Sequence, residues 1–141
     1  MKKGYHQADA FFRQPDNTAD KITAIKGEIE YLFWLMLPSG IDYSGDKVQS
    51  SPEDILPEYA AHKADLEQEL KELQRTYLEQ LKAVKNVIEQ VTEVNNFGAT
   101  ILSEYYISHK TITRIAEDHH YSRDGIYKAR NKALYQSQQF I

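Results

Sequence analysis

The sequence predicts an all-α protein with an N-terminal helical hairpin, one long coiled-coil-like helix, and a C-terminal unit of three shorter helices. Apolar residues recur every three or four positions along two long stretches, which is the period of an amphipathic helix. The second stretch contains no glycine or proline from Glu58 to Glu93. After it come three short apolar segments, each preceded by a residue that commonly caps a helix.

Residues 1–16 are polar, contain Pro15 and the pair Phe11-Phe12, and show no sustained period. We expect a flexible arm here. The first helix should begin near Asn17-Thr18 and end at Leu37–Gly40. Its helical face comprises Ile22, Ile25, Ile29, Leu32, Phe33 and Met36. Tyr31, Trp34 and Leu35 widen this face, so the segment is expected to be buried on more than one side.

Residues 41–51 are rich in glycine, serine and aspartate and are predicted to form a loop. A second helix should begin at Ser51-Pro52 or, because of Pro57, near Glu58. Its apolar residues follow a heptad-like pattern with one stutter. They are Leu66, Leu70, Leu73, Tyr77, Leu81, Val84, Ile88 and Val91.

The relative lengths of the two helices lead to a prediction of self-association. At 1.5 Å per residue the second helix would span roughly 50 Å and the first roughly 30 Å, so the first could cover only part of the apolar seam. A second copy of the same helix would cover the remainder. We therefore predict a homodimer through Leu73, Tyr77, Leu81, Val84, Ile88 and Val91. In the alternative, the C-terminal helices fold back onto this seam.

The region 95–141 is predicted to be a separate three-helix unit. Asn95-Asn96 ends the long helix and caps the next, which covers residues 97–107. Thr111 caps a helix over residues 112–118, and Ser122 caps the last, from Arg123 to about Gln138. The chain therefore divides into an arm (1–16), a hairpin and oligomerisation region (17–94) and this C-terminal unit.

Composition restricts the function classes. The chain of 141 residues has no cysteine, which excludes disulfides and thiolate sites. No apolar segment of a signal peptide follows the basic start, and the most apolar run, Tyr31 to Leu37, is too short to span a membrane. We expect a cytoplasmic protein without cofactors. No paired-carboxylate, nucleophile–base or phosphate-loop pattern indicates an enzyme.

Charge is distributed unevenly. Residues 109–141 contain six Lys/Arg and three acids, whereas the remainder of the chain has a net charge of −7. A basic end on an acidic chain favours an anionic partner at that end, although chance clustering gives the same distribution.

The last two helices, joined by a four-residue turn, match a helix-turn-helix unit. Ala116 lies where two such helices cross, and a small residue there lets the backbones approach. The apolar positions that join the pair are Ile112, Ile115, Tyr121, Ile126 and Ala129. The outward side of the last helix offers Arg123, Asp124, Tyr127, Lys128, Asn131 and Lys132. These groups can contact base edges and phosphates, although many amphipathic helices carry a solvated charged face.

The adjacent His119 and His120 raise the question of a metal site. Neighbouring positions seldom give two ligands suitable geometry, and only Asp118 lies near. We interpret the pair as part of the turn, with His120 at the position that requires a positive φ.

Residues 102–134 resemble the fourth region of bacterial sigma factors, which binds the upstream (−35) element of promoters. The matching positions are Tyr105, Thr111, Ile115-Ala116, Ser122-Arg123-Asp124 and Lys132-Ala133-Leu134. A closer resemblance, which includes Gly45-Asp46-Lys47-Val48, is to late-gene transcription regulators of the RinA and ArpU type from Gram-positive phages and prophages. The chain departs from the sigma pattern at Glu104, Gly125 and Lys128, so the resemblance does not imply the same DNA sequence.

This resemblance implies that Arg123, Asp124 and Lys128 contact bases and that Thr111 and Ser122 contact phosphates. Helix geometry adds Tyr127 and Asn131. The expected function is a phage or prophage transcription regulator that binds double-stranded DNA in a sequence-specific way. Contact with host RNA polymerase is implied by the family resemblance alone. One alternative is an interaction protein that binds a host factor such as RNA polymerase through the long helix. A small terminase subunit is a further alternative, disfavoured because terminases commonly place the helix-turn-helix first.

Overall fold

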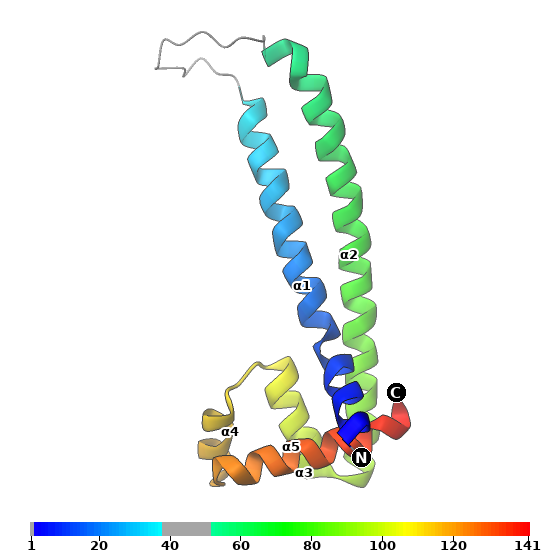
Figure 1. The fold of residues 1–141 in the computed structure, drawn as a ribbon, viewed down its shortest axis with the longest axis vertical. Helices are drawn as coiled ribbons and strands as arrows, with labels where there is room; N and C mark the ends of the chain where they lie inside the picture. Colours follow the sequence, from blue (N-terminus) through cyan, green and yellow to red (C-terminus); the bar gives the residue numbers. More distant parts are fainter. Residues whose placement is uncertain (1, 38–51) are drawn as a thin grey trace. The chain divides into compact units, whose positions relative to one another are not determined.

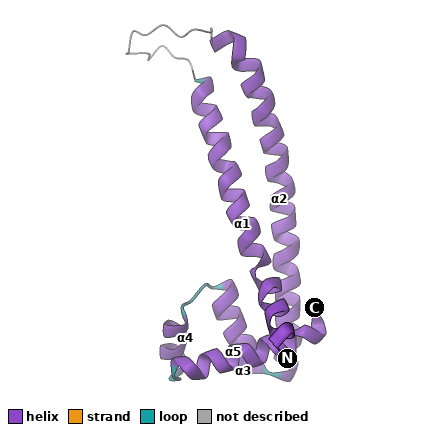
Figure 2. Ribbon diagram, in the orientation of Figure 1, coloured by secondary structure: helices purple, strands orange, loops and turns teal. Residues whose placement is uncertain are grey.

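The computed structural model describes residues 2–37 and 52–141, and every regular element within these ranges is helical (Figures 1 and 2). The elements are α1 (Lys2–Met36), α2 (Pro52–Val94), α3 (Asn96–Leu102), a π-helical turn η1 (Ser103–Ile107), α4 (Ile112–His119), α5 (Arg123–Ser137) and a 3₁₀ turn η2 (Gln138–Phe140). The predicted all-α class is confirmed. The loop predicted over residues 41–51, with its Gly45–Val48 motif, and the helix boundaries predicted at 38–40 and at Ser51 lie outside the described residues.

The predicted flexible arm is wrong, because α1 begins at Lys2 and not near Asn17-Thr18. Ala8, Phe12 and Pro15 follow at spacings of four and three residues and are buried. A proline inside a helix removes a backbone hydrogen bond and costs about 3 kcal/mol. Burial of this helical face offsets that cost, and its partners lie far away in the sequence.

The chain divides into two compact units. One joins Met1–Asn17 with Leu78–Ile141, and the other is Thr18–Tyr77. The division therefore differs from the predicted boundary at residues 94 and 95. The end of α2 belongs with the C-terminal helices because it shares their core.

The unit Thr18–Tyr77 contains a small apolar core. Ile25, Leu32 and Leu66 are buried, with Ile29, Tyr59, Leu70 and Leu73 packed against them. The expectation that the end of α1 is buried on more than one side is wrong. Tyr31 is 64% exposed and Trp34 is 63% exposed. Only the narrow face toward α2 is covered.

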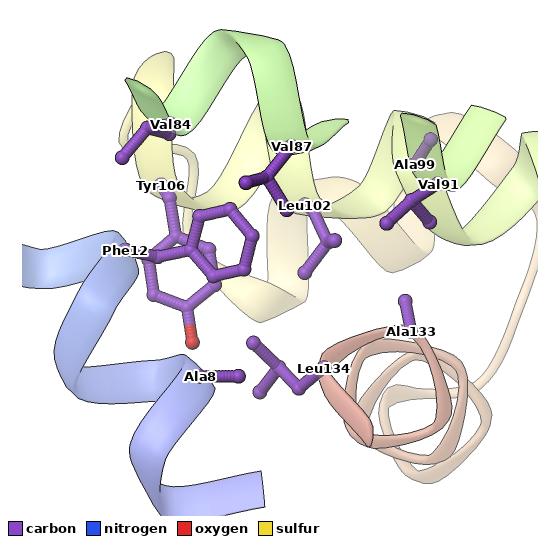
Figure 3. Close-up of a cluster of buried hydrophobic side chains, with 10 residues drawn as sticks. All are labelled: Ala8, Phe12, Val84, Val87, Val91, Ala99, Leu102, Tyr106, Ala133 and Leu134. Atoms are coloured by element: carbon purple, nitrogen blue, oxygen red, sulfur yellow. The ribbon is translucent and has the colours of Figure 1, made fainter. Parts of the chain in front are cut away.

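The other unit has a larger core, to which α1, α2, α3, η1 and α5 all contribute (Figure 3). Its buried members are Ala8, Phe12, Val84, Val87, Val91, Ala99, Leu102, Tyr106, Ala133 and Leu134. In Figure 3 the ring of Phe12 lies beside that of Tyr106, and the two stack with centroids 5.2 Å apart. The first turns of α1 are thus part of the same hydrophobic core as α5.

This core also covers the seam for which a second copy was expected. Val84 and Val91 are buried against residues of the same chain, and Ile88 packs at their side. Leu73 packs against the small core of the unit Thr18–Tyr77. The expected uncovered seam is therefore wrong for Leu73, Val84, Ile88 and Val91, and at Val84–Val91 the C-terminal helices lie on the seam, as in the alternative. The error came from the length of α1, which has 35 residues. The homodimer itself stays a prediction.

Candidate nucleic-acid interface

The C-terminal helices begin where local capping signals predicted. Asn95 caps α3, and its Oδ1 accepts a hydrogen bond from Gly98 N at 2.9 Å. A Cβ at Gly98 would lie 2.8 Å from the Cβ of Ala133, so α3 and α5 pack too closely for a side chain there. The helix then widens into η1, where Ser108 N donates to Ser103 O at 3.0 Å.

The turn between α4 and α5 has the predicted left-handed residue. His120 has φ 59° and ψ 41°. Its N–H donates to Glu117 O at 3.3 Å, and Tyr121 N donates to Ala116 O at 2.9 Å. This pair of bonds is the Schellman arrangement that ends many helices. Histidine tolerates this conformation better than most residues, so the turn prediction for His120 is confirmed.

A second apolar cluster joins α3, α4 and α5. Its buried members are Ile101, Ile112, Ile115, Ala116 and Ile126, with Phe97, Tyr105 and Ala129 partly buried beside them. Four of the five predicted contacts between the last two helices are thus present. Tyr121 is the exception, because it is half exposed and its ring stacks on Phe97 with centroids 4.9 Å apart.

His119 has a structural partner. Its Nε2 lies 3.0 Å from a carboxylate oxygen of Glu104, and its ring meets Phe97 edge-on. These contacts tie the end of α4 to η1. Within residues 2–37 and 52–141, no three His, Cys, Asp or Glu side chains are grouped so that they could hold a metal ion.

The structure brings most of the predicted contact residues onto one side of α5. Asp124, Tyr127, Lys128 and Asn131 follow at spacings of three, one and three residues, which places them on one helical face. Asp124, Tyr127 and Lys128 are exposed and Asn131 is half-buried. Lys128 Nζ lies 3.2 Å from Asp124 Oδ2, so each charge on this face is partly neutralised by the other.

Arg123 and Lys132 flank this face. Both are exposed, and neither forms an ion pair with another described residue. Two other cations nearby are paired: Arg114 Nε lies 3.1 Å from Asp118 Oδ1, and Lys110 Nζ lies 3.2 Å from Asp118 Oδ2. Arg123 and Lys132 therefore carry the uncompensated positive charge next to the face.

The two hydroxyl groups expected at phosphates have local partners. Thr111 Oγ1 accepts from Arg114 N at 3.1 Å, and Ser122 Oγ accepts from Gly125 N at 2.9 Å. Both residues are exposed and act as helix caps. Their O–H groups remain donors, so capping is compatible with a contact to an anionic oxygen.

A cleft of ≈ 440 Å³ lies at the edge of this side. Arg13 of α1, Lys110, Thr111, Arg123 and Tyr127 contribute to its lining. Sequence reasoning missed Arg13, because the helix that carries it was not predicted.

Polar contacts hold α1 to η1 beside this cleft. Arg13 Nη2 donates to Tyr105 Oη at 3.3 Å, and its Nε lies 3.0 Å from Asp9 Oδ1. The hydroxyl of Tyr106 donates to Asp9. Burial, together with this hydrogen bond, raises the pKa of Tyr106 well above its usual value. The hydrogen bond to Tyr105 is the main cause that raises the pKa of Arg13.

Sequence reasoning also missed Arg130. It is only 8% exposed, and its Nη2 donates to Tyr5 Oη at 2.7 Å. The signal was present in the sequence: Ile126, Arg130 and Ala133 share one helical spacing, so the arginine had to face the core. A charge at such a position needs polar partners.

No protein-family model matches the chain, and no match was found among curated proteins or among solved structures. None of the helices in the described part of the chain has the length and apolar character needed to cross a membrane. The resemblance to sigma region four and to phage late-gene regulators therefore stays a prediction from the sequence.

Proposed function

We propose that this chain is a sequence-specific DNA-binding transcription regulator that reads double-stranded DNA with α5. The observation that carries the proposal is the exposed face of α5, a mixture of polar groups flanked by the unpaired cations Arg123 and Lys132. Two helices joined by a short, fixed turn present this face, as in helix-turn-helix proteins. The resemblance described above adds the expectation of a phage or prophage late-gene regulator.

Charge supports an interaction at this side of the molecule. Residues 109–141 have three more cations than acids, while the chain as a whole has a net charge of −4. Contacts to phosphates would supply most of the affinity and would weaken as salt rises, because they release counterions from the DNA. Side chains on α5 would supply the preference among base sequences.

Selection of bound duplexes from a random pool tests the proposal. The purified protein is used at about 0.15 M salt, where non-specific binding is weak. We expect one enriched motif. Replacing Arg123 with alanine should weaken binding to that motif by about 1–3 kcal/mol and relax the preference at one base pair, whereas Lys132→Ala should weaken binding to all sequences similarly.

Lys71→Ala provides a matched control, because Lys71 is an exposed lysine on α2, away from the C-terminal helices in sequence. It should leave both affinity and motif unchanged. Equal binding of the parent and Arg123→Ala to the selected motif would exclude the assigned role of Arg123. A failure to enrich any motif would contradict the proposal itself.

A second candidate function is binding to a protein partner, which the exposed aromatic residues of α1 favour. Tyr31, Phe33 and Trp34 are all more than half exposed, and exposed apolar patches often mark interaction sites. For the regulator, the resemblance implies host RNA polymerase as such a partner. Transcription in vitro from a template with the selected motif, with and without the protein, tests that contact.

A further inference from the structure

The side chain of Asn131 is held in one orientation by its neighbour Arg130. Arg130 Nε and Nη2 lie 3.2 Å and 3.0 Å from Asn131 Oδ1. Arg130 is itself held by the hydroxyl of Tyr5 at 2.7 Å. Its guanidinium also lies against three aromatic rings, with centroids at 5.0 Å (Tyr105), 5.3 Å (Tyr127) and 6.0 Å (Tyr5).

These contacts determine which end of the Asn131 amide is free. Arginine has five N–H donors and no acceptor, so the amide atom that faces it must be the oxygen. Two N–H groups converge on that oxygen and occupy its two lone pairs. The amide therefore has only its NH₂ group, with two donors, for a further partner.

The free NH₂ group belongs to a residue on the face assigned to base contacts. Asn131 follows Asp124 by seven residues and Tyr127 by four, so the three share one side of α5. The Nδ2 atom of Asn131 has no hydrogen-bond partner among the described residues. The amide is thus held by the protein on one side and unoccupied on the other.

We propose that Asn131 acts only as a hydrogen-bond donor and selects guanine at one position of the bound DNA. The inference rests on the DNA-binding function proposed above. In the major groove, guanine presents two acceptors, N7 and O6. The common pairing of asparagine with adenine requires the amide oxygen to accept from N6. In this protein Arg130 occupies that oxygen.

Tyr5 and Arg130 are then positioning residues for Asn131. Neither would touch DNA. Tyr5 comes from the first turns of α1, so the N-terminal segment would influence which base the last helix selects. Losing the Tyr5 hydroxyl should therefore change base preference at the Asn131 position more than it changes binding to random DNA.

The test measures binding to four duplexes that differ only at the base pair opposite residue 131. To find that position, motifs are selected separately with the parent and with Asn131→Ala. The position sought is the base pair at which the parent shows a preference and Asn131→Ala shows none. Fluorescence anisotropy should show that the parent prefers guanine by about five-fold or more, the lower end expected for one base contact. Asn131→Ala should bind all four duplexes within about two-fold of one another.

Two further variants test the orientation of the amide. Asn131→Asp keeps an acceptor for Arg130 but has no donor, so its preference should move from guanine to cytosine, whose N4 donates. Arg130→Met releases the amide oxygen, and its preference should move toward adenine. Because Arg130 is buried, that variant is first checked by its helical signal and melting temperature. If Arg130→Met does not fold, Tyr5→Phe, which removes only one hydroxyl, is used in its place.

Asn96→Ala is the matched control. Asn96 is an exposed asparagine on α3, and its replacement should leave the motif unchanged. If the parent binds a motif but prefers adenine opposite residue 131, or if Asn131→Ala leaves every position unchanged, the inference is overturned and the proposed function stands. If the parent enriches no motif, both are overturned.

Discussion

Replacing Phe12 with alanine should strongly destabilise the C-terminal helices, although Phe12 belongs to the first helix of the chain, because it shares a buried core with Ala133 and Leu134 of α5. Phe12 is 1% exposed. Aromatic side chains bury at least about 150 Å², and at about 25 cal/mol per Å² that area corresponds to about 4 kcal/mol. Measured Phe→Ala losses of about 3–5 kcal/mol agree with this value. Domains are stable by only about 5–15 kcal/mol, so the loss would be large.

Amide hydrogen exchange at Ala133 and Leu134 measures how far this substitution lowers the local stability of α5. Both residues are buried in the same core as Phe12 (Figure 3). We expect their opening free energy to fall by about 3–5 kcal/mol in Phe12→Ala. Phe33→Ala is the control, because Phe33 is 53% exposed, and it should change the value by less than about 0.5 kcal/mol. Similar small changes in both variants would show that the first turns of α1 do not support α5.

Three further predictions concern single positions. Gly98→Ala should destabilise by about 1–3 kcal/mol in urea unfolding, because its Cβ would meet Ala133 at 2.8 Å. A Cβ at Gly27 would have nothing within 4 Å, so Gly27→Ala should stabilise the protein by about 0.5–1 kcal/mol. A change in the free energy of unfolding of the same sign in both variants would contradict the close packing of α3 on α5. His120→Val should cost at least about 1–2 kcal/mol in thermal unfolding because φ is positive, while His120→Gly should cost nothing. Hydrogen bonds from Lys110 and, to a smaller extent, Arg114 lower the pKa of Asp118. The ionised Asp118 carboxylate should therefore stabilise the protein above about pH 4, and this stabilisation should disappear as pH falls through the lowered pKa. An acid-unfolding profile unchanged in Asp118→Asn would refute that contribution.

The sequence by itself determined the C-terminal helices closely. Their boundaries depend on local signals, since Asn95, Thr111 and Ser122 each cap a helix by bonding an N–H three residues ahead. The turn at His120 is equally local, because its bonds reach back only to Glu117 and Ala116. Interactions over so few residues can be recognised without knowledge of the rest of the fold. For the same reason, helical spacing alone placed most of the predicted contact residues of α5 on one face.

Only the tertiary structure decided that the N-terminal segment is helical and which side chains cover the seam on α2. Residues 2–16 carry a weak helical pattern interrupted by Pro15, and they are helical because Ala8 and Phe12 are buried against α2, η1 and α5. The same burial covers Val84 and Val91, which belong to the apolar seam expected to bind a second copy. The orientation of Asn131 likewise depends on Arg130 and, through it, on Tyr5. Such effects arise from burial between residues distant in sequence, and no local pattern specifies which distant surface an apolar face will meet.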